Sequence, residues 1–207
     1  MSKDAWLWYE GKDGEVESDI PDLAELFVEK NVSKILDLGC GTGRHSIYLS
    51  AHGFQVSGFD WSENAVKRAK ERLEAARVGA DLRVWEMQSI PYPYGLGAFD
   101  AVITIKVIHH SMFRSIKKIM HEIERVTRSG GYLYVQVPVF EKAARLEKEG
   151  LRSQEVEPGT FRPLEGDEQG IPHHYFRKDE LLSLLGNYKI VDMNVKCEHY
   201  CVTSLKK

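Results

Sequence analysis

The chain has 207 residues, of which 43% are hydrophobic and 29% are charged, and its formal net charge at pH 7 is −3. These values predict one globular domain with one sizeable core. The slightly acidic balance gives no reason to expect nucleic acid as the main partner, although a local basic patch remains compatible with it. No apolar run reaches the length of a membrane span, and Met1-Ser2-Lys3-Asp4 does not start a signal peptide, so we expect a cytoplasmic protein that does not bind membranes.

The three cysteines are Cys40, Cys197 and Cys201. Their odd number and the lack of a C-x-x-C pair predict reduced thiols. Cys40 stands inside a glycine-rich stretch, where we expect a small residue that allows close packing rather than a nucleophile.

The first 18 residues carry Trp6, Trp8 and Tyr9 among polar residues and glycines. Aromatic side chains bury well in two settings, so this segment is either a cover over a cleft or a plug on the outside of the core. A helix is predicted over residues 19–30, with Pro21 in its first turn.

A glycine-rich loop follows the first predicted strand. The apolar residues of the strand are followed by Gly39, Gly41 and Gly43, and helical spacing then continues to about Gly53. Such glycines let a backbone approach a ligand, and the next helix offers unpaired N–H groups to an anion. A dinucleotide loop would need glycine where Arg44 or Ser46 stands, so that ligand class is excluded. A turn that serves only packing is the alternative.

The next two strands are predicted to end in acidic residues. Residues 54–60 end in Asp60, 21 residues after Gly39, where a parallel strand places a carboxylate beside a nucleotide ribose. Trp61 is expected to lie on an adenine ring or, alternatively, to pack on the helix that Ser62 caps. The third strand, residues 82–85, is followed by Glu86 and Met87.

The most apolar run, residues 99–105, predicts a central strand covered on both faces, and a histidine pair follows it. His109 or His110 is a candidate general base or substrate-orienting group, with an indirect hydrogen-bonding role as the alternative. Adjacent side chains diverge and no second ligand pair stands at metal spacing, so we expect no metal ion here.

The remaining chain predicts a helix over residues 112–126 closed by Gly130-Gly131, and a strand over 132–137. Residues 138–176 contain a charged helix over 141–148 and many turn residues, which indicates an insertion or lid. Within it, the pair His173-His174 either closes over a bound substrate or forms a polar turn, and His174 is the candidate site residue. A helix over 177–185 and a hairpin of strands 191–197 and 200–205 end the chain.

The pattern Asp37-x-Gly39-x-Gly41-x-Gly43, together with Phe99-Asp100-x-Val102 and Ile108-His109-His110, resembles motifs I and IV of the class I S-adenosylmethionine (SAM)-dependent methyltransferases. The resemblance implies SAM as cofactor, with Asp37 and the glycine backbone at its amino-acid end. It implies that Asp60 binds the ribose and Glu86, where the family commonly has Asp, the adenine amino group. The full set of expected cofactor-binding residues is Asp37, Gly39, Cys40, Gly41, Gly43, Arg44, Asp60, Trp61, Glu86, Met87 and Ile105.

The order of the predicted elements indicates a doubly wound, Rossmann-like α/β fold. The resemblance specifies a mostly parallel seven-stranded sheet of order 3-2-1-4-5-7-6, with the last strand antiparallel and helices on both faces. Residues 1–207 would form a single methyltransferase domain, with residues 1–18 as a possible cover and residues 138–176 as a possible lid.

The expected function is methyl transfer from SAM, with His109, His110 and His174 as candidate catalytic residues. A small-molecule acceptor is favoured, because no separate recognition domain is evident. A tRNA nucleoside is the first alternative, because residues 103–110 and 175–182 also resemble wobble-uridine tRNA methyltransferases. A non-catalytic SAM-binding subunit that regulates a partner is the second.

Overall fold

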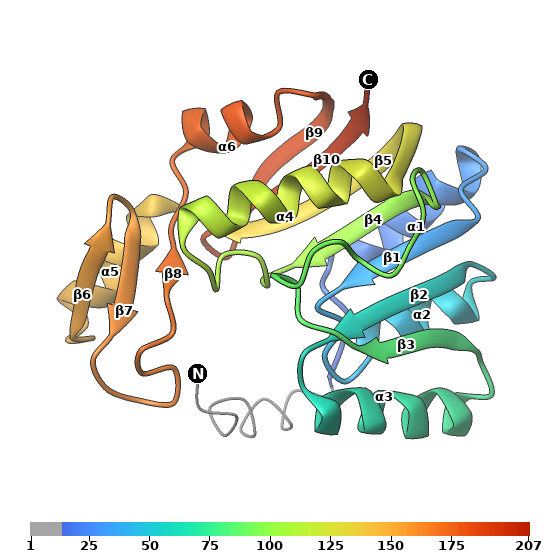
Figure 1. Cartoon of the computed structure of the whole chain (residues 1–207), viewed down its shortest axis with the longest axis horizontal. Coiled ribbons are helices and arrows are strands. Elements are labelled where there is room, and N and C mark those ends of the chain that lie inside the picture. Colours follow the sequence, from blue (N-terminus) through green and yellow to red (C-terminus); the bar gives the residue numbers. More distant parts are fainter. Residues whose placement is uncertain (1–13) are drawn as a thin grey trace.

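The computed structural model describes residues 14–207, so the predicted roles of Trp6, Trp8 and Tyr9 lie outside the described residues. Its main sheet contains seven strands, which in spatial order are β3 (Ala80–Val84), β2 (Gln55–Asp60), β1 (Lys34–Leu38), β4 (Phe99–Ile105), β5 (Thr127–Pro138), β10 (His199–Lys206) and β9 (Tyr188–Lys196). Strands β1 to β5 are parallel, and β10 is antiparallel to both of its neighbours. The predicted order, with its antiparallel last strand, is confirmed (Figure 1).

Helices cover both faces of this sheet. Side chains alternate in direction along each strand, so one strand contributes apolar residues to a core on each face. Leu36 and Leu38 of β1 join a buried core with α4 (Phe113–Val126) and α6 (Lys178–Leu184). Ile35 joins the core on the other face with α1 (Ile20–Glu29) and α2 (Arg44–Ala51). Burial on both faces accounts for the apolar sequence of β4.

One further helix, α3 (Glu63–Ala76), packs beside β2 and β3. Its predicted cap is confirmed, since the Ser62 hydroxyl accepts a hydrogen bond from the Ala65 N–H at 3.2 Å. No helix among residues 14–207 is both long enough and apolar enough to span a bilayer.

The prediction that Gly130-Gly131 closes the helix before β5 is wrong. Helix α4 ends at Val126, and β5 begins at Thr127 and contains both glycines. The pairing of β4 with β5 shifts register between Phe99 and Ala101, beside these glycines. A Cβ on Gly131 would lie 2.8 Å from the Thr127 Cγ2 and 2.9 Å from the Asp100 carbonyl oxygen, so the glycine allows two strands to approach closely.

A second, three-stranded sheet follows α5 (Phe140–Lys148) and consists of β6 (Ser153–Glu157), β7 (Thr160–Pro163) and β8 (His173–His174). The helix was predicted, but the strands were not. They are short and mostly polar, and turn residues such as Pro158, Gly159 and Gly166 interrupt any alternating pattern. Figure 1 shows this sheet on the side to which the arrowheads of β2, β3 and β4 point, so it faces the carboxyl ends of the parallel strands.

Candidate active site

The glycine loop lies at the carboxyl end of β1 and has one packed side and one open side. Gly39, Gly41 and Gly43 have φ values of 76°, 52° and 81°, which side-chain-bearing residues rarely adopt. A Cβ on Gly39 would lie 2.5 Å from the methyl carbons of Val107, and a Cβ on Gly43 would lie 2.9 Å from the Cβ of Ala69. A Cβ on Gly41 would meet no atom of residues 14–207 within 4 Å. A ligand can therefore approach the loop backbone at Gly41.

Asp60, the last residue of β2, is bound to this loop. Its Oδ2 accepts a hydrogen bond from the Gly41 N–H at 3.0 Å, and its Oδ1 accepts one from the Ser62 N–H at 2.9 Å. Burial raises the pKa of Asp60 against the opposing effect of these N–H groups. Each carboxylate oxygen has a further lone pair, so Asp60 can still accept hydrogen bonds from a ligand.

Two of the predicted cofactor residues, Asp37 and Cys40, have buried side chains. The Asp37 carboxylate accepts a hydrogen bond from the Ser46 hydroxyl at 2.6 Å, and burial, with the nearby Asp60 adding to it, raises the pKa of Asp37 to about 6. The Cys40 thiol packs with Val66 and Leu82, and burial raises its pKa well above the ordinary value. Cys40 is therefore a packing residue rather than a nucleophile, and all three cysteines are free thiols.

The other predicted cofactor residues lie at the ends of neighbouring strands. Val84 of β3 pairs with Asp60 of β2, and two residues beyond it Glu86 is exposed to solvent. Met87 is partly buried, with its carbonyl oxygen bound to the Tyr92 hydroxyl at 3.0 Å.

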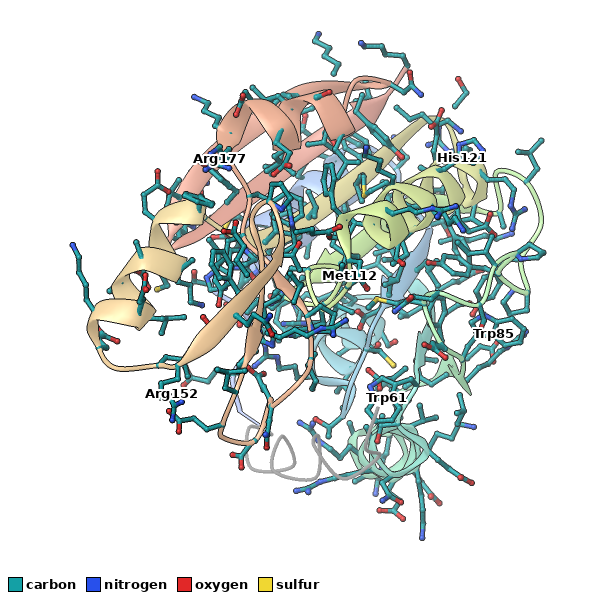
Figure 2. All side chains as sticks on the ribbon, turned by 60° about the vertical axis from the view of Figure 1, so that its left-hand side comes forward. Trp61, Trp85, Met112, His121, Arg152 and Arg177 are labelled. Atoms are coloured by element: carbon teal, nitrogen blue, oxygen red, sulfur yellow. The ribbon has the colours of Figure 1, made fainter. Side chains whose placement is uncertain are left out.

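Trp61 directly follows β2, between this strand and the start of α3 (Figure 2), and is half-buried. Ile105 is the buried last residue of β4. The ends of β1, β2, β3 and β4 thus meet at one edge of the sheet.

Two cations beside the loop converge on one carboxylate. The guanidinium of Arg44, at the start of α2, and the ammonium of Lys106, directly after β4, each lie 2.9 Å from the Oε1 of Glu17. Burial raises the pKa of Glu17, but Lys106 and Arg44 outweigh it and hold the pKa below its ordinary value. The Glu17 N–H also donates to the Nε2 of His45 at 3.3 Å, and burial lowers the pKa of that histidine to about 3.

Glu17 and Lys106 were not predicted as site residues. They are 89 positions apart in sequence, and no local motif joins them. Lys106 does have an unusual backbone, with a φ of 58°. Sequence reasoning cannot detect that conformation in a lysine, because residue type gives no signal for it.

A cluster of three histidines lies beyond the end of β4. His109 and His110 belong to a turn in which the His110 N–H donates to the Val107 carbonyl at 3.0 Å, and their ring centroids are 3.9 Å apart. The His174 N–H donates to the His109 carbonyl at 2.8 Å and holds β8 against this turn. The ring of His173 consequently lies 5.9 Å from that of His109 and 4.7 Å from that of His110.

These three imidazoles are uncharged at neutral pH. Burial lowers the pKa of His109 and of His110 well below the ordinary value, and it lowers the pKa of His173 to about 4.

His174, which was a predicted site residue, points away from this cluster. Its Nδ1 lies 2.7 Å from the Thr160 hydroxyl and its Nε2 lies 3.0 Å from the Glu180 carboxylate. Its ring is fully buried and stacks on Phe113. The structure thus joins His109 and His110 with His173 rather than with His174. Adjacent side chains of a strand point to opposite sides, and the sequence does not reveal which of the two faces the site.

Comparisons with known proteins agree with this geometry. Residues 36–135 match a family described as a methyltransferase domain. The chain is 31% identical over 151 residues to the 27-O-demethylrifamycin SV methyltransferase of Amycolatopsis mediterranei, covering 70% of this chain and 54% of that protein. It is 29% identical over 161 residues to the probable tRNA methyltransferase 9B of Bos taurus, covering 70% and 33% respectively.

A solved structure shares the fold. A SAM-dependent methyltransferase from Methanosarcina mazei has a TM-score of 0.76 at 22% identity, over 93% of this chain and 99% of that chain. The chain spans about half or less of the length of the curated relatives that it matches. Residues 36–135 nevertheless contain the glycine loop, Asp60, Glu86 and the histidine pair after β4. The chain therefore carries a methyltransferase domain of the class I SAM-dependent family.

Proposed function

We propose that this protein is an enzyme that binds SAM at the carboxyl edge of the parallel strands and transfers its methyl group to a small-molecule acceptor. One observation carries the proposal: the open side of the glycine loop at Gly41 lies beside the carboxylate of Asp60, on the adjacent strand end. A nucleoside with an attached amino acid needs a close-approaching backbone at one end and a hydrogen-bond acceptor for its ribose at the other.

Each part of SAM has a partner at this edge. The remaining lone pairs of Asp60 accept the two ribose hydroxyls, and the exposed Glu86 accepts the adenine amino group while the Met87 N–H donates to the ring. The buried charge of Asp37 beneath the loop attracts the ammonium of the methionine part, and the cation of Arg44 attracts its carboxylate.

The chemistry requires little of the protein beyond alignment. The methyl group of SAM is already activated by its positive sulfur, so the protein holds an acceptor atom in line with it and excludes water. The imidazoles of His109 and His110 lie beyond β4, and burial makes them weak bases, so we expect them to orient the acceptor group by hydrogen bonding rather than to keep its proton. Replacing His110 with alanine should therefore lower turnover more than SAM affinity.

The first test is calorimetric titration of the purified protein with SAM, with S-adenosylhomocysteine and with NAD. We expect binding of the two sulfur compounds and not of NAD. Asp60→Ala should weaken SAM binding tenfold or more, since hydrogen bonds to a charged group contribute about 1.5–3 kcal/mol. Asp81→Ala, which removes an exposed carboxylate from β3, is the matched control. Equal SAM affinities for the wild type and Asp60→Ala would contradict the ribose assignment.

A small-molecule acceptor is supported by the net charge of −3 and by the name of the Amycolatopsis relative, which methylates a rifamycin. The test is transfer of a labelled methyl group from SAM to a fractionated metabolite extract. Label in a low-molecular-weight fraction supports this acceptor class. Transfer to any acceptor would also exclude a non-catalytic regulatory role.

A tRNA acceptor is the second candidate, favoured by the name of the Bos taurus relative. A protein that binds RNA through phosphate contacts loses affinity steeply as salt increases. Labelled methyl in tRNA, together with RNA binding that weakens between 50 and 200 mM salt, would favour this acceptor over a small molecule.

A further inference from the structure

We propose that His109, His110 and His173 bind a divalent transition-metal ion, of which Zn²⁺ is the best fit, at the acceptor side of the methyl-transfer site. The acceptor assignment rests on the proposed function, whereas the metal site rests only on the histidine cluster. We expected no metal because adjacent side chains diverge and no second ligand pair stands at metal spacing in the sequence. The structure instead brings a third imidazole, that of His173, from 63 positions further along the chain.

The three side chains are close enough to share an ion. One nitrogen of each histidine lies within 4.8 Å of the others. Tetrahedral zinc with Zn–N bonds of about 2.0–2.1 Å separates its ligands by about 3.4 Å, so an ion requires the ring nitrogens to close by at most about 1.4 Å. His109 and His110 lie in a turn rather than in a strand, and their ring centroids are only 3.9 Å apart. Adjacent histidines can therefore bind the same ion here.

Two nitrogens of the cluster are buried and make no hydrogen bond within residues 14–207. Among the described residues, neither the buried Nδ1 of His109 nor the buried Nε2 of His173 has a hydrogen-bond partner. A buried polar atom without a partner destabilises the fold by about 1–3 kcal/mol. Neutral imidazoles are the commonest metal ligands, and coordination would satisfy such atoms.

Charges near the cluster act in both directions. A carboxylate oxygen of Glu168 lies 3.4 Å from the Nε2 of His173 and brings the negative charge that a bound cation favours. Lys142 opposes a cation: its ammonium lies 3.4 Å from the Nε2 of His199, and its charge reaches all three histidines of the cluster. His199 is also near His109 and is uncharged at neutral pH, since burial lowers its pKa to about 4.

The position of the cluster indicates a use for the ion. Three protein ligands leave one position of a tetrahedral zinc ion for another molecule, as in catalytic zinc sites. An acceptor hydroxyl or thiol bound there would release its proton to water, because zinc lowers the pKa of its ligands. The lone pair on its oxygen or sulfur would then form a bond to the methyl carbon, and the electron pair of the broken carbon–sulfur bond would remain on S-adenosylhomocysteine. The acceptor class is therefore a small molecule with an ionisable hydroxyl or thiol group.

The test is calorimetric titration of Zn²⁺ alone into the untagged 207-residue chain after treatment with a chelator. We expect one tight site. His173→Ala should weaken Zn²⁺ binding on the order of 100-fold or more, since even residues that only orient ligands contribute 10–100-fold to metal affinity. Glu168→Gln should weaken it by a smaller factor, on the order of tenfold.

Two further variants separate metal binding from damage to the fold. His121→Ala is the matched control, because His121 is an exposed histidine on α4 outside the cluster (Figure 2), and its affinity for Zn²⁺ should equal that of the wild type. Lys142→Met removes the opposing charge and should tighten Zn²⁺ binding several-fold, an effect that a damaged fold would not produce.

The metal proposal and the proposed function fail separately. Titration with SAM is run on the same samples, and His173→Ala should keep wild-type SAM affinity. Zn²⁺ binding that is weak or that survives His173→Ala while SAM still binds would overturn the metal site and leave the methyltransferase proposal intact. Tight Zn²⁺ binding without SAM binding would support the metal site and contradict the proposed function.

Discussion

The two sides of the site are built in different ways. The glycine-loop side consists of residues 37–43 and Asp60, most of them consecutive in sequence, and it lies on a sheet buried on both faces. The facing side, β6 to β8 with α5, contains short strands. Neither α5 nor β6 has a buried residue, and the buried residues of β7 and β8 are mostly polar. A region with few buried apolar contacts opens at a lower free energy than a packed core. We therefore expect the glycine-loop side, where the cofactor is proposed to bind, to be rigid. We expect the facing side, where the acceptor is proposed to bind, to open more easily.

Polar contacts hold the small sheet to the rest of the molecule. The Glu157 carboxylate of β6 accepts hydrogen bonds from the first N–H of α4 and from the Thr160 hydroxyl. His174 connects β8 to Glu180 of α6, and Arg145 of α5 binds Glu198 in the turn before β10. A substitution that removes one of these hydrogen bonds or ion pairs should therefore destabilise the small sheet more than it destabilises the main sheet.

The largest effect is expected from Gly39→Ala. The new methyl group would lie 2.5 Å from Val107, and the φ of 76° is unfavourable for alanine. Overpacking costs about 1–3 kcal/mol and a left-handed alanine about 1–2, so the free energy of unfolding should fall by about 2–5 kcal/mol. Urea denaturation measures this loss.

Gly41→Ala, in the same loop, is the matched control for Gly39→Ala. It has the same backbone penalty at a φ of 52°, but no atom in the described part of the chain lies within 4 Å of its new Cβ. It should fold with a loss of only about 1–2 kcal/mol and still lose SAM affinity, because the methyl group enters the ligand's space. Equal stabilities for the two variants would show that contact with Val107 is unimportant.

The second effect concerns Asp37, whose pKa of about 6 lies above its ordinary value of 3.8 because of burial. The folded protein then binds this proton more strongly than the unfolded chain, so stability falls as pH rises from about 4 to 7. Asp37→Asn removes that loss and keeps an oxygen for the Ser46 hydroxyl. At pH 7 it should be more stable than the wild type by up to about 3 kcal/mol.

Urea denaturation of both proteins at pH 4.5 and pH 7.5 measures this difference. Their gap should widen with pH, whereas Asp81→Asn, at an exposed carboxylate, should change stability by less than about 0.5 kcal/mol at either pH. A gap that stays constant between the two pH values would mean that Asp37 has an ordinary pKa in the folded protein.

The same contrast explains how much could be predicted from sequence. The main sheet was predictable because its strands are apolar runs and its glycine loop is a local pattern, in which Gly39 and Gly43 allow close packing and Gly41 leaves an open side. Asp60 followed from its distance along the chain, since a parallel strand fixes where a carboxylate can lie.

The small sheet could not be predicted in this way. Its strands pair through contacts such as Thr160 with His174, and no alternating apolar pattern marks them. The histidine cluster depends on that pairing, because β8 carries His173 to the turn after β4. The start of β5 at Thr127 was also missed, since a register shift beside Gly131 depends on the neighbouring strand.

The third effect, on the small sheet, comes from His174→Ala. The substitution removes a buried ring and leaves the Thr160 hydroxyl and the Glu180 carboxylate without it, which costs about 1–3 kcal/mol. Amide hydrogen exchange should speed up in β7 and β8, while exchange in β1 and β4 and the affinity for SAM stay at wild-type values. Equal acceleration in β1 would show that the two sides open together.

The smallest effect is expected from Arg145→Lys. The guanidinium binds both carboxylate oxygens of Glu198 at 2.7 Å each, and a lysine cannot reproduce this paired contact. Both side chains are more than a third exposed, so water and salt already weaken their attraction. Exchange of the α5 amides should therefore rise by less than about tenfold at low salt, and the difference from the wild type should shrink in 0.5 M NaCl. A larger change that salt does not affect would mean that the Arg145–Glu198 pair alone holds α5 and the small sheet in place. It would contradict the view that many weak polar contacts share this role.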